Sequence, residues 1–295
     1  MFIDFRVRPP LKSFTRLSIY TNTWLKGLFD FHGGTPESAR ERSLAKLRSE
    51  MAQCGVKRAV VWGRAVDDPR ESTNNDDVAA IVRENSDVFV AGLGGICVRG
   101  SGEEPIAQAV AETERSISVL GLKGITMEPM FGMKPVAHPN EERFYPIYER
   151  CEQLGGILGL TVCRGSGDTQ DLDHSDPAHV DRLARTFPRL TIVVSHAFWP
   201  WVEKSCGLAF RRDNVYLHPD MYGVGMPGHT AWVELANTVA PHKLIFGSAY
   251  PIIGIRELVA GYLALPFKSE QVRRMVMHDN AARLLGLPLS DSAGS

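Results

Sequence analysis

The fold class is decided by residues 190–196, which read LTIVVSH. This run is almost continuously apolar, is rich in β-branched residues, and ends at two polar side chains. Such composition is typical of a strand that is covered on both faces, as the strands of parallel sheets are. The histidine at its end is then placed at the carboxyl-terminal edge of the sheet.

Seven similar runs occur along the chain, with helical patterns between them. Alternating strands and helices indicate βαβ units around a parallel sheet. Eight strands predict a single (β/α)8 barrel, also called a TIM barrel, over residues 1–287, with a flexible tail at 288–295. An open doubly wound sheet is the alternative, but no GxGxxG follows the first run. The other seven runs cover residues 2–7, 58–62, 88–93, 122–127, 157–162, 215–218 and 243–246.

The overall charge excludes several classes of partner. Lys and Arg number 33 against 34 Asp and Glu, so we expect no nucleic acid and no anionic membrane as a partner. The chain begins without the apolar stretch of a signal peptide and contains no run of 18 apolar residues, which predicts a soluble cytoplasmic protein. The cysteines form no CxxC pair, and we expect reduced thiols.

Two arginines in the first strand are candidate ligands for an anion. Asp4, Arg6 and Arg8 alternate with apolar residues, so a period of two places them on one face, toward the mouth of a barrel. The guanidinium fork matches a carboxylate or a phosphate, which makes Arg6 and Arg8 candidates for substrate binding and for oxyanion stabilisation. The alternative is that they pair with acidic side chains of the protein, for example Asp4 or Glu128.

Further basic residues follow other strands. Arg64 comes after the second run and Arg164 after the fifth, and together with the first-strand arginines they would form a positive bowl at the mouth. Cys163 precedes Arg164 and is a candidate for substrate binding. A nearby cation would favour its thiolate, whereas the simpler interpretation is a small residue that fills the core.

His196 is the strongest candidate for proton transfer, because imidazole changes charge near neutral pH. Its alternative role is to hydrogen-bond its neighbours without catalysis. His218, which ends the seventh run, is a second candidate, with Asp220 as a base. Trp199 and Tyr222 lie in the loops that follow, where they could form the apolar wall of a pocket or pack the loops onto a helix.

Four segments resemble the amidohydrolase-related family, which contains carboxylate decarboxylases, hydratases and lactonases. They are Ile3-Asp4, LTIVVSH at 190–196, LIFGSAYP at 244–251 and DNAARLLGL at 279–287. The resemblance implies a barrel whose strand ends hold a divalent metal. Its ligands would be HxH on strand one, a histidine each on strands five and six, and an aspartate on strand eight.

The matching positions in this chain are Arg6, Arg8, Cys163, His196 and Ala249, so only one histidine remains. A guanidinium has no lone pair to donate and repels a cation. Catalytic zinc usually has three protein ligands. We therefore expect no metal cofactor at the family position, with zinc at a degenerate site that includes His196 as the alternative.

These observations favour a metal-independent, lactonase-like hydrolase of a small carboxylated molecule. Arg6 and Arg8 would hold the anion, and His196 would move a proton. One alternative is a decarboxylase or hydratase of a carboxylated substrate, and another is a catalytically silent barrel that binds a small anion. The resemblance also implies a homo-oligomer, since members of the family often dimerise.

Overall fold

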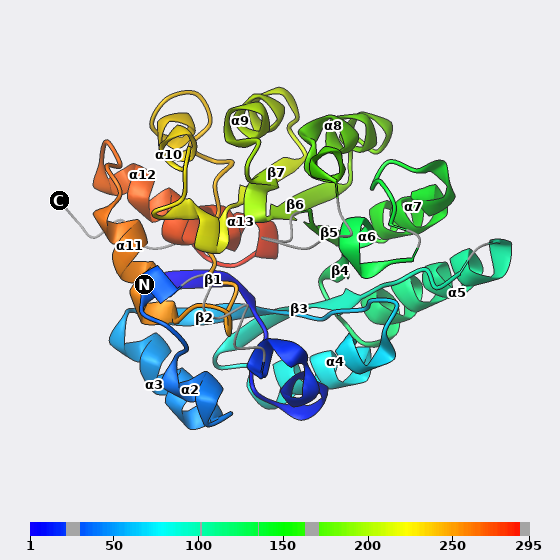
Figure 1. Ribbon diagram of the computed structural model, residues 1–295, viewed down its shortest axis with the longest axis horizontal. Helices are drawn as coiled ribbons and strands as arrows, with labels where there is room; N and C mark the ends of the chain where they lie inside the picture. The colour runs from blue at the N-terminus through cyan, green and yellow to red at the C-terminus, as the bar shows by residue number, and fades with distance from the viewer. Residues whose placement is uncertain (22–29, 101, 135, 163–170, 290–295) are drawn as a thin grey trace.

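The carboxyl ends of seven parallel strands meet at one edge of a curled sheet. The computed structural model describes residues 1–21, 30–100, 102–134, 136–162 and 171–289 (Figure 1). The strands pair in the order of the sequence, and every pair is parallel. They are β1 (Phe2–Val7), β2 (Val56–Trp62), β3 (Phe89–Gly95), β4 (Gly124–Met127), β5 (Ile157–Thr161), β6 (Thr191–Ser195) and β7 (Val215–His218).

Helices connect consecutive strands, and Figure 1 shows these connecting helices around the outside of the sheet, whereas the last helix, at residues 280–285, lies in the middle of the view. Each crossover therefore returns the chain to the same edge, which is what a parallel sheet requires. Among the described residues no helix has the length and apolar character needed to cross a bilayer. The helices are α2 (Glu37–Arg40), α3 (Leu44–Gln53), α4 (Asn75–Glu84), α5 (Glu103–Glu114), α6 (Pro129–Gly132), α7 (Tyr145–Gln153), α8 (Pro177–Thr186), α9 (Val202–Arg211), α10 (Thr230–Asn237), α11 (Ile255–Ala264), α12 (Glu270–Arg274) and α13 (Asn280–Leu285).

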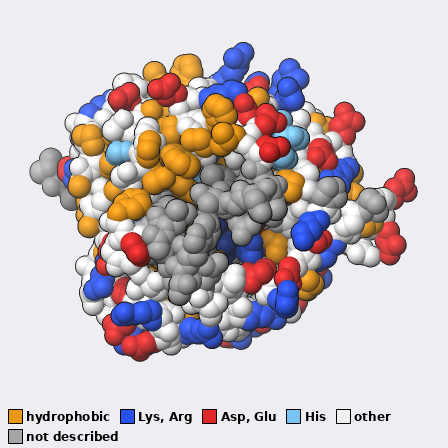
Figure 2. Space-filling model, viewed as in Figure 1, with side chains coloured by type: hydrophobic (Ala, Val, Ile, Leu, Met, Phe, Trp, Pro, Cys, Tyr) orange, Lys and Arg blue, Asp and Glu red, His pale blue; other side chains and the backbone are white. Residues whose placement is uncertain are grey.

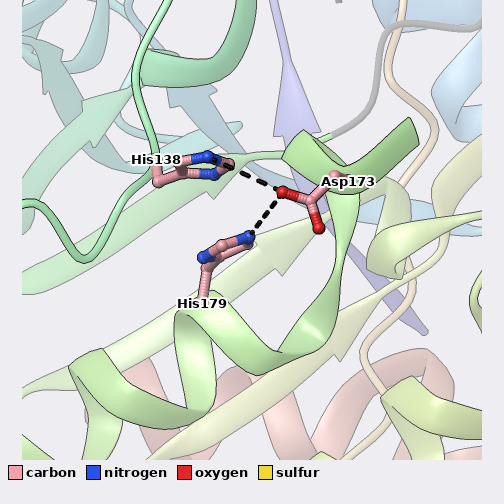
Figure 3. A group of neighbouring side chains, drawn as sticks. All are labelled: His138, Asp173 and His179. Atoms are coloured by element: carbon pink, nitrogen blue, oxygen red, sulfur yellow. Dashed lines mark ion pairs between the residues drawn. The ribbon is translucent and has the colours of Figure 1, made fainter. Parts of the chain in front are cut away.

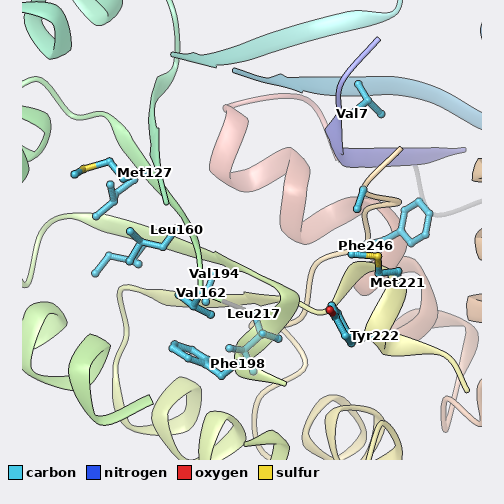
Figure 4. Packing of buried hydrophobic residues seen from close by; sticks show 14 of the residues in the cluster. Val7, Met127, Leu160, Val162, Val194, Phe198, Leu217, Met221, Tyr222 and Phe246 are labelled. Atoms are coloured by element: carbon cyan, nitrogen blue, oxygen red, sulfur yellow. The ribbon is translucent and has the colours of Figure 1, made fainter. Parts of the chain in front are cut away.

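Apolar side chains cover both faces of the sheet, as the runs in the sequence predict. On the face toward the helices, Met127, Leu160, Val194 and Leu217 stand in register on β4 to β7 and form a buried row (Figure 4). A second buried cluster on the other face includes side chains from β1, β2, β3 and β6 together with three residues of α13. Its members include Ile3, Phe5, Trp62, Leu93, Val193, Ala281, Ala282 and Leu285.

The eighth predicted strand, 243–246, is not a strand in the described structure. Its chain nevertheless lies between the two edges of the sheet, because Leu244 bridges Leu217 and Tyr250 bridges Val7, both in parallel. The Ile245 amide donates to the Leu217 carbonyl and the Phe5 amide donates to the Phe246 carbonyl, but two other N–H groups of the segment have partners outside the ladder. The Phe246 amide donates to the carbonyl of residue 276, and the Ser248 amide donates to the Asp4 carboxylate.

The alternation predicted for the first strand is interrupted by a β-bulge. Asp4 pairs with residue 59 and Val7 with residue 61, so three steps of β1 face two steps of β2. The extra residue places consecutive side chains on one side. The Phe5 ring lies 6.4 Å from the Trp62 ring, and the Arg6 guanidinium lies 5.5 Å over the same ring. Phe5 and Arg6 thus approach the same ring, so the prediction that Asp4, Arg6 and Arg8 alternate strictly with the apolar residues of this strand is wrong. All three polar side chains are buried.

The predicted tail at 288–295 is described only in part, since residues 290–295 lie outside the described ranges.

Candidate functional site

Asp220 is the hub of a buried cluster at the carboxyl ends of β1, β6 and β7. Its carboxylate accepts hydrogen bonds from the Ser195 hydroxyl at 2.8 Å, from the His196 amide at 3.2 Å and from His196 Nδ1 at 2.9 Å. His218 Nδ1 lies 3.3 Å away, and Arg6 Nη1 lies 3.6 Å away. Burial raises the pKa of Asp220, but the charges and hydrogen bonds of the two histidines outweigh it and lower this pKa well below its ordinary value. Asp220 is thus a carboxylate.

The ionised Asp220 determines the tautomer of His196. A carboxylate can only accept, so Nδ1 of His196 must carry the proton and Nε2 presents a lone pair. Burial, together with nearby Arg6 and His218, lowers the pKa of His196 despite the opposing effect of Asp220. The Tyr222 ring lies edge-on at 5.2 Å from the imidazole, and Trp199 stacks on Tyr222 at 5.2 Å. His196 is therefore a neutral base with one aromatic wall.

Glu128, at the end of β4, holds a second set of charges. It accepts from Arg8 at 2.7 Å and from Arg64 at 2.9 Å, and Arg64 also reaches Glu71 at 3.2 Å. Burial opposes ionisation of Glu128, but the charges of Arg64, Arg8 and Arg6 outweigh it and lower its pKa to about 2. Arg8 therefore pairs with Glu128, which is one of the two acidic partners that the sequence suggests for it.

Arg6 differs from Arg8, because its side chain is 3% exposed and yet incompletely paired. Within the described residues, Nε and Nη1 of Arg6 have no hydrogen-bond partner, although Nη1 is within ion-pair distance of Asp220. Its guanidinium lies over Trp62. A buried cation with unused donors is a costly arrangement unless something else satisfies it. In the face shown in Figure 2, basic side chains lie at the bottom of a central depression.

Backbone strain is concentrated at the same strand ends. Seven non-glycine residues have positive φ in the described structure. Five of them follow β6, follow β7 or lie in the segment 243–250, which runs beside both β7 and β1. Each costs about 1–3 kcal/mol, and such strain commonly accompanies functional positions. The five residues are His196 (φ 67°), Ala197 (42°), Phe198 (66°), Asp220 (46°) and Ala249 (57°).

The structure brings most of the predicted residues together. Arg6, His196, His218, Trp199 and Tyr222 lie in or beside the cluster around Asp220. Arg8 and Arg64 lie in the neighbouring set around Glu128. Cys163 and Arg164 lie outside the described residues. The central roles of Asp220 and Glu128 were missed, since the sequence suggested them only as a base and as a partner. Polar residues directly after strands are the signal that could have ranked them higher.

The described residues at the family metal position do not make a donor set that fits a divalent cation. Arg6 and Arg8 place two guanidinium groups where ligands would be, and Ala249 has no donor. Of the described residues at these positions, only His196 offers a lone pair, and its Nδ1 is engaged by Asp220. This set supplies fewer than the three ligands that catalytic zinc usually has.

Comparison with known proteins supplies the family. The amidohydrolase family profile matches residues 3–287. Among solved structures, an uncharacterized TIM-barrel protein, Bb4693 from Bordetella bronchiseptica, is 34% identical with a TM-score of 0.88, covering 97% of this chain and 98% of that one. The 5-carboxyvanillate decarboxylase LigW from Sphingomonas paucimobilis is 19% identical with a TM-score of 0.63, covering 97% and 98%.

A manganese-bound dihydroxybenzoic acid decarboxylase from Polaromonas sp. JS666 is 14% identical with a TM-score of 0.68, covering 97% of this chain and 96% of that one. At these identities the two decarboxylases show the fold alone. A search of curated proteins finds no match.

Proposed function

The chain belongs to the amidohydrolase family, and from this premise we propose that it is a metal-independent hydrolase of an ester or lactone that carries a carboxylate. One observation carries the proposal: the His196–Asp220 pair lies beside Arg6, which keeps two unused donors among the described residues. The segment 243–250 would complete an eight-stranded barrel around them. The predicted small carboxylated partner matches the chemistry of this cluster.

His196 would act as the general base. Its Nε2 takes a proton from a water molecule, whose oxygen attacks the acyl carbon and forms a tetrahedral intermediate. The carbon–oxygen bond to the leaving group then breaks, and the same proton passes from Nε2 to the leaving oxygen. Asp220 keeps Nδ1 protonated throughout and stabilises the imidazolium that forms.

Arg6 would supply the positive charge for the substrate. A guanidinium aimed at an oxyanion in a water-poor site stabilises charge that develops during acyl transfer. Arg8 is already bound to Glu128 and is a weaker candidate for direct contact, so its proposed part is to position Arg6 through like-charge repulsion. The sequence suggests that Arg6 and Arg8 both hold the anion, whereas this assignment gives the direct contact to Arg6.

Decarboxylation is the rival reaction, because most of the structural neighbours are decarboxylases by name. An arginine bound to the departing carboxylate stabilises the starting acid more than the transition state, in which that charge moves away. The residues around Asp220 therefore favour hydrolysis. The third alternative, a catalytically silent barrel that binds an anion, would give the His196–Asp220 pair no catalytic role.

The test measures both reactions on the purified protein. Lactones that carry a carboxylate would be assayed for acid release, and aromatic carboxylic acids for release of carbon dioxide. We expect lactone opening that persists after chelation and is lost in His196→Gln. Carbon dioxide release would contradict the proposal. So would activity that disappears with EDTA and returns with manganese, or thermal stabilisation by carboxylates without any turnover.

A further inference from the structure

A second group of side chains with unsatisfied nitrogen atoms lies away from Asp220. Figure 3 shows His138, Asp173 and His179 pointing toward one another. Nε2 of His138 lies 3.7 Å from the Asp173 carboxylate, and Nε2 of His179 lies 3.5 Å from the same oxygen. His138 is in the connection that follows β4, and the other two are in the connection that follows β5. We propose that these three side chains bind Zn²⁺.

The hydrogen bond of His179 orients its lone pair toward this point. Nδ1 of His179 lies 3.0 Å from the side-chain oxygen of Asn140, an acceptor, so Nδ1 carries the proton. Nε2 is buried and has no hydrogen-bond partner among the described residues. Its lone pair thus faces a carboxylate oxygen. A metal ligand commonly donates its other N–H to an oxygen in this way, which fixes the tautomer for coordination.

Protonation of these histidines would be unfavourable, because their rings are stacked on one another. The His138 ring stacks on His179 at 3.9 Å between centroids and on His174 at 4.6 Å. Imidazolium rings in such contact repel one another. One divalent cation between the rings and the carboxylate of Asp173 would satisfy all three ligands at once.

The geometry and the donor types favour zinc. The three ligand atoms lie within 4.8 Å of one another. Tetrahedral zinc with bonds near 2.0 Å requires ligand separations of about 3.3 Å, close to the two histidine–carboxylate distances of 3.7 and 3.5 Å. Imidazole nitrogen also selects zinc over magnesium and calcium, which prefer oxygen alone. Asp173 is 68% exposed, so an ion can enter from solvent and keep a water as its fourth ligand.

The site joins two connections, so an ion there would hold the segment with His138 to the beginning of α8. Binding to the folded protein alone raises its stability in proportion to the logarithm of free ion over the dissociation constant. The inference is independent of hydrolysis, because none of its residues belongs to the cluster around Asp220. Either proposal can fail without the other.

The experiment titrates the full chain, first stripped by dialysis against a chelator, with zinc chloride in a calorimeter. We expect one ion per chain and a rise in melting temperature. His138→Ala, Asp173→Asn and His179→Ala should each weaken binding by at least about tenfold, and Asn140→Ala by about tenfold through loss of the orienting bond. His242→Ala is the matched control, since His242 is exposed elsewhere, and should bind like the original protein.

Three results would overturn the site. One is zinc binding that survives both His138→Ala and His179→Ala, and another is binding that is lost in His196→Ala instead. The third is magnesium binding as tight as zinc binding. Circular dichroism of each variant confirms that a lost signal reflects lost ligands, and a cobalt spectrum of the original protein gives the coordination geometry independently of calorimetry.

Discussion

Nδ1 of His196 lies 2.9 Å from Oδ1 of Asp220, and the carboxylate that receives this hydrogen bond is fully buried. Asp220→Asn keeps the shape but offers an amide that can stabilise the wrong tautomer. We expect kcat for lactone opening to fall by roughly 10²–10⁴-fold with a smaller change in KM. Steady-state kinetics measures kcat and KM separately. Asp181→Asn, at a partly exposed ion pair with Arg212, is the control.

The pH profile should report the lowered pKa of His196. Neutral imidazole is the active base, so kcat/KM should rise with pH along a limb centred below the ordinary value of 6.5. Asp220 raises this pKa and nearby Arg6 lowers it, so Arg6→Met should move the limb to higher pH and Asp220→Asn to lower pH. A limb at or above 6.5 in the original protein would argue against His196.

The lowered pKa of His196 also makes the free energy of unfolding depend on pH. Below pH 6.5 the unfolded chain binds a proton at this histidine while the folded chain resists it, so the unfolding free energy falls as the pH falls below 6.5. Above pH 6.5 both states are neutral at His196, and this contribution is constant.

Arg6→Met should weaken the binding of benzoate, used as a simple carboxylate probe, by roughly 10–100-fold. A hydrogen bond to a charged group contributes about 1.5–3 kcal/mol. Calorimetric titration gives the dissociation constant. Arg70→Ala removes a guanidinium that is 89% exposed and should leave binding unchanged. Equal affinity in Arg6→Met and the original protein would remove Arg6 from the substrate site.

Glu128→Gln should destabilise the fold by about 3–5 kcal/mol, because it leaves two arginines near the strand ends without their shared counter-charge. Urea denaturation followed by circular dichroism measures the change. Asp181→Asn breaks a more exposed pair and should cost about 1 kcal/mol or less. Similar losses in both variants would mean that the Glu128 network adds little to folding.

Two glycines give a paired test of packing. A Cβ at residue 247 would lie 1.8 Å from Nε2 of His218, so Gly247→Ala must displace a buried ring and should cost about 1–3 kcal/mol. Gly207 lies in α9 with no neighbouring atom within 4 Å of such a Cβ. Gly207→Ala should therefore stabilise the protein by about 0.5–1 kcal/mol. Thermal unfolding compares them, and a stable Gly247→Ala would contradict the close contact.

Local sequence determined the strands of this protein. Seven of the eight predicted runs are strands, with ends that agree within two residues, because a strand buried on both faces needs a continuous apolar run whatever surrounds it. The same reasoning located the arginines and His196 at strand ends. The run at 243–246 is not a strand in the described structure: the Ile245 amide donates to Leu217 of β7, but the Phe246 amide donates to residue 276, a partner that the run itself does not reveal.

Only the tertiary structure decided which charges meet. Glu128 is 120 residues from Arg8 in the chain, and Asp220 is 24 residues from His196, yet both pairs form hydrogen bonds shorter than 3 Å. The bulge in β1 likewise arises from pairing with β2. Apolar patterns follow from transfer of each side chain out of water, a local property. Ion pairs depend on distance through space, which the spacing of residues along a chain does not contain.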